Sequence, residues 1–441
     1  MDWLEDYKKL LSFASISTEA EFKKEVLACF DWVKKEVEKL GFETEVWKTP
    51  GHPTLFAAGP KVTGKPTILI YNHYDVQPVD PLDLWATPPF EPTVREGVMY
   101  ARGAQDNKGQ LFYVLLALKK IKEKEGDFPL NIKLLIEGEE EMGSKNLPHL
   151  LKKHESQLKA DYVAIVDCGI PDSQTPAVSL GLRGLITMDV EVTGTLTDLH
   201  SGSHGGLAYN PNLALVEILA SAKDKEGRVT IPGFYDAIQE LTPDEKKGIH
   251  FAFDEAGYQT QYGTTATGGE KKYSPRERNW LRPTLEINGL SGGYCGKGFK
   301  TVIPSKASAK LSCRLVRGQD PQKVATLVAH WIESQAPAGI QVKVNVHEGF
   351  GQAVLTSPYS KGIQAFATAF SEVFQKPCQF TLEGATIPIT ADLQKVTGGE
   401  VILVGLGLNS DQIHAPNEHF SLDRIEKGQK IISQALKILS K

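Results

Sequence analysis

Short apolar runs and amphipathic helical segments alternate along the first and last parts of the chain. Helical periodicity runs from about Glu21 to Leu40, where Gly41 ends it, and again through the apolar segment 109–124. Strand-like apolar runs occupy residues 66–75, 131–141, 161–169 and 400–414. This alternation is typical of βαβ units. It predicts an α/β domain in which a mostly parallel sheet is flanked by helices on both faces.

The middle of the chain follows a different order of elements. The pattern predicts strand, helix, strand, strand, helix and strand at 185–194, 210–224, 282–290, 305–316, 320–335 and 340–349. That order is the split βαβ of ferredoxin-like domains. We therefore expect residues 184–353 to form a small α+β domain inserted into a larger one, which comprises residues 1–183 and 354–441. The polar stretch from Lys223 to Asn279 is predicted to be a loop or extension.

Composition and charge narrow the class of protein. The 441 residues carry a formal net charge of -5, and no block of basic residues with aromatics between them suggests nucleic-acid binding. No apolar run approaches the roughly 20 residues that span a bilayer, and the N-terminal segment lacks the features of a signal peptide. The 5 cysteines are scattered and odd in number. We therefore expect a cytoplasmic protein without disulfides, bound neither to nucleic acid nor to a membrane.

Acidic and histidine side chains gather where the predicted strands end. The sequence "LIEGEEEMGS" places four glutamates within residues 137–141, directly after an apolar run. Because ligands of open α/β sheets bind beyond the carboxyl ends of the strands, these groups should meet at one edge. The candidates at that edge are His73, Asp75, Glu140, Glu141, Asp167 and His414. Burying such a set of carboxylates without a partner is unfavourable, so a cation is expected there.

The donor types at these strand ends indicate which cation. Histidine and carboxylate ligands without thiolate favour zinc, with manganese as second choice. Two histidines and several carboxylates exceed the usual three protein ligands of one catalytic zinc, so a pair of divalent metals that share a carboxylate is predicted. Of Glu140 and Glu141, one can bind metal and the other can take a proton from a water that the metals activate. Asp75 can hold the free ring N–H of His73. Asp106 is either an N-cap of the following helix or a further member of the cluster.

Longer motifs along the chain resemble a known family. In order, they read "HYDVQP", "WATPPFEPTVREGVMYARGAQDNKG", "EGEEEMGS", "LGLRG", "DLHSGSHGG", "KTVIPSKASAKLSCRL" and "IHAPNE". The chain resembles the dinuclear zinc metallopeptidases that include cytosolic non-specific dipeptidase, carnosine dipeptidase, succinyl-diaminopimelate desuccinylase and glutamate carboxypeptidase, most of all the dipeptidase branch. The resemblance covers nearly the whole chain. It implies a catalytic α/β domain, an inserted lid and dimerisation domain at 184–353, and a homodimer that hydrolyses dipeptides or other short peptides.

The resemblance also implies roles for single residues. One metal would be bound by His73, Asp106 and Asp167, and the other by Asp106, Glu141 and His414, with Asp106 bridging. Glu140 would be the general base and Asp75 would orient His73. The resemblance further implies that His200 reaches the active site of the neighbouring subunit and polarises the scissile carbonyl. Thr301 and Arg314 would hold the substrate. Arg314 would bind the carboxylate of the substrate, a group that a guanidinium is well suited to bind.

One loop departs from the family pattern. Dipeptidase relatives often carry Arg-Glu-Gly-Gly-Ser-Ile-Pro, whereas this chain reads "LEGATIP" from Leu382 to Pro388. In the family this loop contacts the carboxylate end of the substrate. The backbone N–H groups of Ala385 and Thr386 can still serve there, so both remain candidate substrate-binding residues.

Three other functions are alternatives to dipeptide hydrolysis. "GLSGG" at 289–293 matches the serine hydrolase motif G-x-S-x-G, but the helix that should follow is not predicted. An N-acyl amino-acid amidohydrolase would use the same metals and the same base, and it stays open as an alternative. A metal-binding scaffold without turnover also stays open, although the presence of Glu140, Asp75 and all five proposed ligands favours an enzyme.

Overall fold

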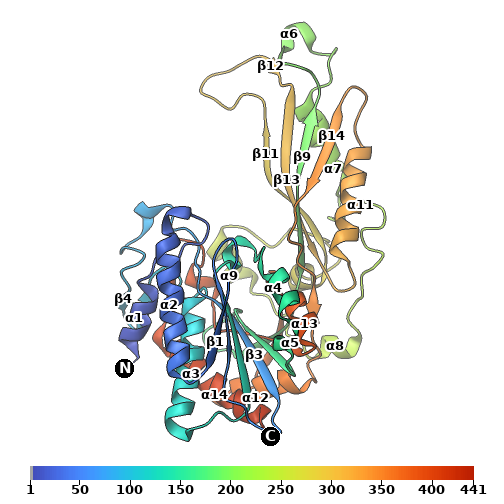
Figure 1. Cartoon of the computed structure of the whole chain (residues 1–441). Coiled ribbons are helices and arrows are strands. Elements are labelled where there is room, and N and C mark those ends of the chain that lie inside the picture. The colour runs from blue at the N-terminus through green and yellow to red at the C-terminus, as the bar shows by residue number, and fades with distance from the viewer. Residues whose placement is uncertain (1–2) are drawn as a thin grey trace.

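The computed structural model describes residues 3–441 and contains two separate main sheets. Figure 1 shows the larger sheet with its helices in the lower part of the molecule, and the smaller sheet extending away from it. The larger domain is formed by the first and last parts of the chain, and the middle of the chain forms the smaller one. The predicted fold class, an α/β domain with an inserted lid, is confirmed.

The larger sheet has nine strands within the described residues. Their order is β1 (Glu43–Trp47), β2 (Thr54–Ala58), β6 (Asn131–Glu137), β3 (Thr67–His73), β7 (Tyr162–Val166), β17 (Glu400–Val404), β8 (Ala177–Leu182) and β15 (Val354–Leu355), with β16 (Gln379–Glu383) also pairing with β8. The central strands β6, β3, β7 and β17 are parallel. Strands β1, β2 and β15 at the margins pair antiparallel, so the sheet is mainly but not wholly parallel.

Helices cover both faces of this sheet because the inner strands are apolar on both sides. Along β3, Ile68 and Ile70 pack into one core and Leu69 and Tyr71 into the other, which is the period-2 alternation of a strand. The first core contains residues of α1 (Leu4–Leu11), α2 (Lys23–Lys39), α3 (Lys108–Glu125), α12 (Lys361–Phe374) and α14 (Leu422–Leu439). The second contains residues of α4 (Leu147–Lys153), α5 (Glu155–Leu158) and α13 (Thr390–Thr397). No helix among residues 3–441 is long and apolar enough to cross a membrane.

The smaller domain has the predicted ferredoxin-like order. Its elements along the chain are β9 (Gly184–Thr193), α7 (Pro211–Ser221), β11 (Thr284–Gly292), β13 (Lys306–Leu315), α11 (Pro321–Ser334) and β14 (Gln341–Val346). The strands are arranged β11-β13-β9-β14, all antiparallel. Every second residue of β9, from Ile186 to Val192, is buried against α7 and α11 in a core of its own. We refer to this domain as the lid.

The stretch between Lys223 and Asn279 differs from the sequence-based prediction. Instead of a loop it contains α8 (Pro243–Lys247) and α9 (Glu255–Tyr262) and most of α10 (Pro275–Leu281). Helices α8 and α10 each begin with a capping box and a proline in the first turn. The stretch is polar, yet Leu241 and Ile249 within it, and Trp280 directly after it, pack into the core of the larger domain. It therefore joins the lid to the catalytic part of the molecule.

Candidate dinuclear metal centre

The proposed metal ligands come from five different places at the carboxyl edge of the parallel strands. His73 is the last residue of β3, and Asp167 follows β7 directly. Glu141 lies in the short turn η3 (Glu140–Met142) after β6, and His414 lies in the loop after β17. Asp106 lies two residues before α3, whose N-cap is Asn107, so the N-cap interpretation of Asp106 is wrong.

These side chains form two clusters that share one carboxylate. His73, Asp106 and Asp167 form the first, and Asp106, Glu141 and His414 form the second; in each, the ligand atoms lie within 4.8 Å of one another. Nε2 of His73 is 3.2 Å from Oδ1 of Asp106, and Nε2 of His414 is 2.9 Å from Oδ2 of the same carboxylate. The two oxygens of Asp106 therefore face the two clusters separately, as a bridging ligand requires.

The chemistry of these clusters fits a pair of divalent cations. Nε2 of His73 and Oε1 of Glu141 are buried and make no hydrogen bond within the described residues. Burial, together with nearby negative groups, raises the pKa of Glu140 and of Asp167 well above the ordinary carboxyl value. Hydrogen bonds that His414 donates to the carboxylates of Asp106 and Glu141 raise its pKa to about 10. Cations placed among these groups would remove the repulsion and give the free donor atoms a partner.

The acidic packet 137–141 divides into two pairs with different surroundings. Glu137 accepts hydrogen bonds from Tyr71 and Ser144, and Glu139 accepts two from the amide of Asn146. Glu140 and Glu141 instead point to the clusters: Glu140 is 4.0 Å from Nε2 of His73, and Glu141 is 3.3 Å from Nε2 of His414. Glu137 and Glu139 are thus held away from the clusters, whereas Glu140 and Glu141 face them. Glu141 also accepts a hydrogen bond from Nε2 of Gln77 at 2.8 Å.

Glycine at position 138 is needed for this turn. A Cβ atom there would lie 2.2 Å from the hydroxyl oxygen of Tyr74, closer than real contacts allow. The chain can therefore turn away from the end of β6 and bring Glu140 and Glu141 over the sheet edge only with glycine at this position.

Asp75 connects His73 to the turn that carries Glu140 and Glu141. Oδ1 of Asp75 is 3.3 Å from Nδ1 of His73, and its carboxylate accepts hydrogen bonds from the backbone N–H groups of Glu140 and Glu141 at 3.3 and 3.1 Å. The hydroxyl of Ser17 donates to the same carboxylate at 2.7 Å. This geometry suits the orienting role predicted for Asp75.

Two further residues support the clusters and were not predicted. Ser17 fixes Asp75 from 58 residues away, a contact for which the sequence holds no signal. Asn107 donates to Oδ1 of Asp167 at 2.6 Å and accepts from Asn72 at 2.7 Å, so it fixes one carboxylate ligand. Its position beside Asp106 in the motif "AQDNKG" was the available hint.

His200 and Thr301 lie together but apart from the metal clusters. His200 is the last residue of β10 (Leu199–His200), and Thr301 directly precedes β12 (Val302–Ile303), the strand that pairs with β10. Nε2 of His200 is 3.5 Å from the Thr301 hydroxyl. Figure 1 shows β12 and the adjoining α6 (Ser201–His204) at the end of the lid farthest from the large sheet. The structure thus brings these two residues together, and not with His73 or Asp106.

Arg314 contacts the loop that departs from the family pattern. Its Nη1 donates to the hydroxyl of Thr386 at 2.8 Å, and that hydroxyl donates to the carbonyl of Arg183 at 2.6 Å. The backbone N–H of Arg183 donates to the carbonyl of Ala385 at 3.2 Å. Arg314 has no carboxylate within ion-pair distance among the described residues, so its guanidinium can take an anionic ligand.

Comparison with known proteins places the chain in a family. The model of peptidase family M20/M25/M40 matches residues 69–438. The chain belongs to peptidase family M20/M25/M40. It is therefore a metallopeptidase, and the resemblance inferred from its motifs is confirmed.

Individual M20 relatives cover nearly all of the chain. The Cys-Gly metallodipeptidase dug1 of Schizosaccharomyces pombe is 32% identical over 96% of this chain and 92% of its own length. The human Beta-Ala-His dipeptidase is 32% identical over 87% of this chain and 77% of its own. Among solved structures, the M20 family metallo-carboxypeptidase Sso-CP2 from Sulfolobus solfataricus has a TM-score of 0.91 at 35% identity, with 100% of this chain and 99% of that chain covered.

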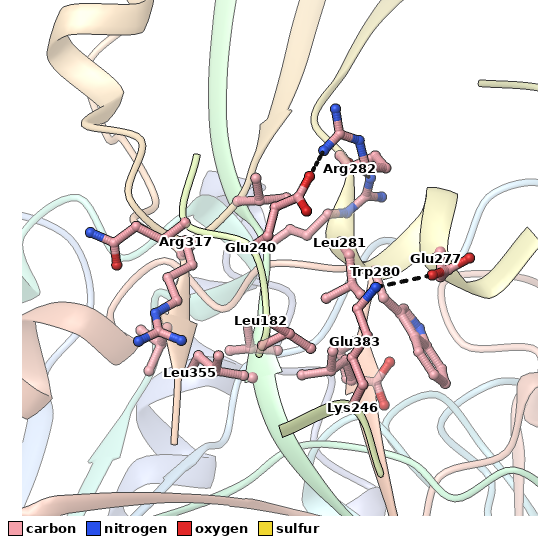
Figure 2. Close-up of a pocket in the computed structure, with 18 of the residues that line it drawn as sticks. Leu182, Glu240, Lys246, Glu277, Trp280, Leu281, Arg282, Arg317, Leu355 and Glu383 are labelled. Carbon is pink, nitrogen blue, oxygen red and sulfur yellow. Dashed lines mark hydrogen bonds and ion pairs between the residues drawn. The ribbon is translucent and has the colours of Figure 1, made fainter. Parts of the chain in front are cut away.

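A cavity separate from the metal clusters lies where the lid meets the M20 catalytic domain (Figure 2). Its walls are largely apolar, with Leu182, Trp280 and Leu355 among them, and an ion pair between Lys246 and Glu277 lies at its side. Leu382, the first residue of the loop "LEGATIP", is buried against this cavity. The side chain of Leu382 is thus buried where the lid meets the larger domain.

Proposed function

We propose that this M20 enzyme hydrolyses the peptide bond of dipeptides, with a water molecule activated by two metals and with Glu140 as general base. The observation that carries the proposal is the pair of clusters sharing Asp106, beside a glutamate that belongs to neither. When bound, divalent metals acidify a water molecule and polarise the scissile carbonyl. The names of the relatives, Cys-Gly metallodipeptidase and Beta-Ala-His dipeptidase, support dipeptides as the substrate class.

Five residues would hold the metals, Glu140 would transfer the proton, and Asp75 would orient one of the ligands. His73, Asp106 and Asp167 are proposed for one ion and Asp106, Glu141 and His414 for the other. Glu140 takes the proton of the attacking water and returns it to the leaving amine. Asp75 keeps the ring of His73 in the orientation in which Nε2 faces the carboxylates of Asp106 and Asp167 and could bind a metal.

The lid would contribute from a second copy of the chain. His200 directly precedes α6, which Figure 1 shows at the far end of the lid, so we propose that it serves the metal centre of a partner subunit in a homodimer and stabilises the developing oxyanion. Thr301 beside it would contact the same substrate. Support for such an interface comes from large apolar side chains exposed on α7, β11 and the loop before α7: Leu207, Leu213, Val216, Ile287 and Leu290.

Arg314 would recognise the free carboxylate of the substrate. Its guanidinium is partly buried, is bonded to the neutral hydroxyl of Thr386, and is thus available for a bidentate contact. The backbone N–H groups of Ala385 and Thr386 are proposed to complete this carboxylate site. The same arrangement would suit a carboxypeptidase acting on longer peptides, the second candidate, which the name of the Sulfolobus relative favours.

The metal and the compartment are inferred from the residue types. Nitrogen and oxygen donors without thiolate suit Zn²⁺ best and Mn²⁺ next. None of the 5 cysteines forms a disulfide among the described residues, and four of these thiols are at least partly buried. We therefore propose a reducing, cytoplasmic location.

Amine release from a matched substrate panel tests the proposed function. Protein stripped with a chelator and reloaded with Zn²⁺ or Mn²⁺ is offered dipeptides, their N-acetylated counterparts and tripeptides. We expect turnover of free dipeptides with metal and none without it. Turnover of the tripeptides as well would favour the carboxypeptidase.

Two other outcomes would contradict the proposal. Cleavage of only the N-acetylated compounds would move the function to an amidohydrolase with the same metal site. No turnover of any compound, with two ions bound per chain and the fold intact, would favour a scaffold.

A further inference from the structure

The loop that carries His414 is held by three polar anchors. Asp411 forms a buried bidentate pair with Arg424, with both N···O distances 2.6 Å. The side chain of Asn417 accepts from the N–H of Ala86 at 2.8 Å. The third anchor is Glu418, whose side chain is fully buried. The loop is thus held on both sides of the proposed ligand.

The backbone of this loop needs such anchors. Gln412, His414 and Asn417 all have φ between 56° and 64°, a conformation that residues with a Cβ atom rarely adopt. Backbone of this kind persists only where surrounding contacts determine it. The position of the His414 ring therefore depends on the anchors more than on local preference.

Glu418 differs from the other two anchors in what it binds. One oxygen of its carboxylate accepts from Nη1 of Arg102 at 2.9 Å and from the N–H of Gly103 at 2.8 Å. The other accepts from the N–H of Gln105 at 2.9 Å and from the N–H of Asp106 at 3.0 Å. All four donors belong to the segment that presents Asp106, the carboxylate shared by both clusters.

The two proposed metal clusters depend on this link to different degrees. His73 and Asp167 lie at the ends of β3 and β7, which are hydrogen-bonded neighbours in the sheet, so the ladder itself sets their spacing. Asp106 and His414 lie on two loops whose nearest strand pairing, β18 (His419–Ser421) with β5 (Val98–Tyr100), ends several residues away from both ligands. The carboxylate of Glu418 ties one loop to the other only four residues after His414.

We propose that Glu418 is a positioning residue that fixes Asp106 relative to His414 and thereby sets the metal affinity of the second cluster. It touches neither substrate nor metal. The inference rests on the proposed function, because it requires that Asp106, Glu141 and His414 bind an ion. Contacts that orient metal ligands commonly change metal affinity 10- to 100-fold when they are removed.

Glu418→Gln is the variant that tests this most directly. Glutamine keeps the shape but replaces one acceptor oxygen by an NH₂ group that faces N–H donors, so part of the clamp is lost. Chelator-treated protein is titrated with Co²⁺, and both the binding isotherm and the visible ligand-field absorption are recorded. We expect the wild type to bind two ions. The variant should bind the second ion about 10- to 100-fold more weakly, with an altered spectrum, and lose less affinity for the first, because the sheet fixes His73 and Asp167.

A matched control separates positioning from general destabilisation. Glu270 pairs with the buried Arg282 at 2.7 Å in the segment that joins the domains, and it lies outside the metal clusters. Glu270→Gln removes the same charge from a comparable buried pair. We expect it to lower the melting temperature while both Co²⁺ affinities and the absorption spectrum stay as in the wild type.

The outcomes distinguish the inference from the proposed function. A wild type that binds fewer than two ions would contradict the proposed dinuclear site itself. Two ions in the wild type, with second-site affinity and spectrum unchanged in Glu418→Gln, would overturn the role of Glu418 alone. If Glu418→Gln does not fold, Glu418→Asp decides: its shorter carboxylate should weaken the second site, and an unchanged second site would overturn the inference.

Discussion

The metal-binding edge and the end of the lid are built in opposite ways. At the edge, side chains from five separate segments converge, and most of them are buried: His73 is fully buried and Glu141 has a side-chain exposure of 3%. At the end of the lid, His200 belongs to β10 and Thr301 directly precedes β12, the strand paired with β10, and both residues are exposed. The first region is complete within a single chain. The second presents polar side chains that lie apart from the metal ligands of the same chain.

This difference indicates how the work is divided. Burial and crowding of carboxylates suit tight metal binding and proton transfer, which need fixed geometry. An exposed histidine on a separate domain suits a group that must arrive with the substrate or from another subunit. The comparison can be tested by removing groups from one region at a time, beginning with the largest expected effect.

Removing the proposed base should abolish turnover without loss of the bound metals. Glu140→Ala is expected to lose several orders of magnitude in kcat, because no other described carboxylate beside the clusters is free to take the proton. Both metals should remain, since Glu140 belongs to neither cluster. Metal analysis and steady-state kinetics on the same sample check this. Turnover within tenfold of the wild type would contradict the role of Glu140.

Removing the lid histidine should lower kcat less. His200→Ala is expected to cost about 10²- to 10³-fold in kcat, the usual loss of one oxyanion donor. Metal content and the oligomeric state should be unchanged, because His200 belongs to neither metal cluster and directly precedes α6, at the far end of the lid in Figure 1. His204→Ala, an exposed histidine on the adjoining helix, is the matched control and should stay near wild-type activity.

For Arg314 we propose a contact with the substrate carboxylate, which its own substitution can test. Arg314→Met should raise KM for dipeptides about 10- to 100-fold, with a smaller effect on kcat. A dipeptide amide lacks the carboxylate, so wild type and variant should differ little with it. Arg317→Met, which breaks the ion pair with Glu245 at 2.9 Å just beyond the same strand, is the control. An equal loss with acid and amide would count against carboxylate recognition.

The smallest effect concerns the joint between the two regions. Burial raises the pKa of Glu383 to about 7, against the attraction of Arg276. The carboxyl group of Glu383 holds its proton more tightly in the folded than in the unfolded protein. The group therefore contributes favourably to the stability of the folded state at low pH. That contribution is lost as pH rises through about 7.

Glu383→Gln should therefore match the wild type near pH 5 and melt a few degrees higher near pH 9, a difference of roughly 1–3 kcal/mol. Melting temperatures by calorimetry across this range test the expectation. Glu123→Gln, at an exposed position of α3, is the control, and its difference in melting temperature from the wild type should not change with pH. A constant difference at all pH values would contradict a pKa near 7 for Glu383.

The sequence was most informative where backbone regularity determines position. Parallel strands end at one edge, so the meeting of His73, Asp167 and the glutamate turn could be predicted from apolar runs alone. The β-α-β-β-α-β order of the lid was predicted in the same way. The division of Asp106 between two clusters came only from the family resemblance, because two loops that are distant in sequence fix its place.

What could not be predicted depends on long-range contacts. Ser17 and Glu418 act through hydrogen bonds to residues 58 and more than 300 positions away. The helices α8 and α10 were missed for another reason. Their starting motifs Thr-Pro-Asp-Glu and Ser-Pro-Arg-Glu are capping boxes visible in the sequence, but a polar stretch without an apolar face favoured a loop.

Mixing two inactive variants tests most directly whether the two regions form one active site across subunits. Glu140→Ala and His200→Ala proteins are combined under conditions in which subunit exchange is demonstrated separately. A heterodimer then has one site with an intact Glu140 and a partner's intact His200, so up to roughly a quarter of wild-type activity should return. No recovery despite complete exchange would contradict the account, and it would mean that His200 does not act on the partner's metal centre.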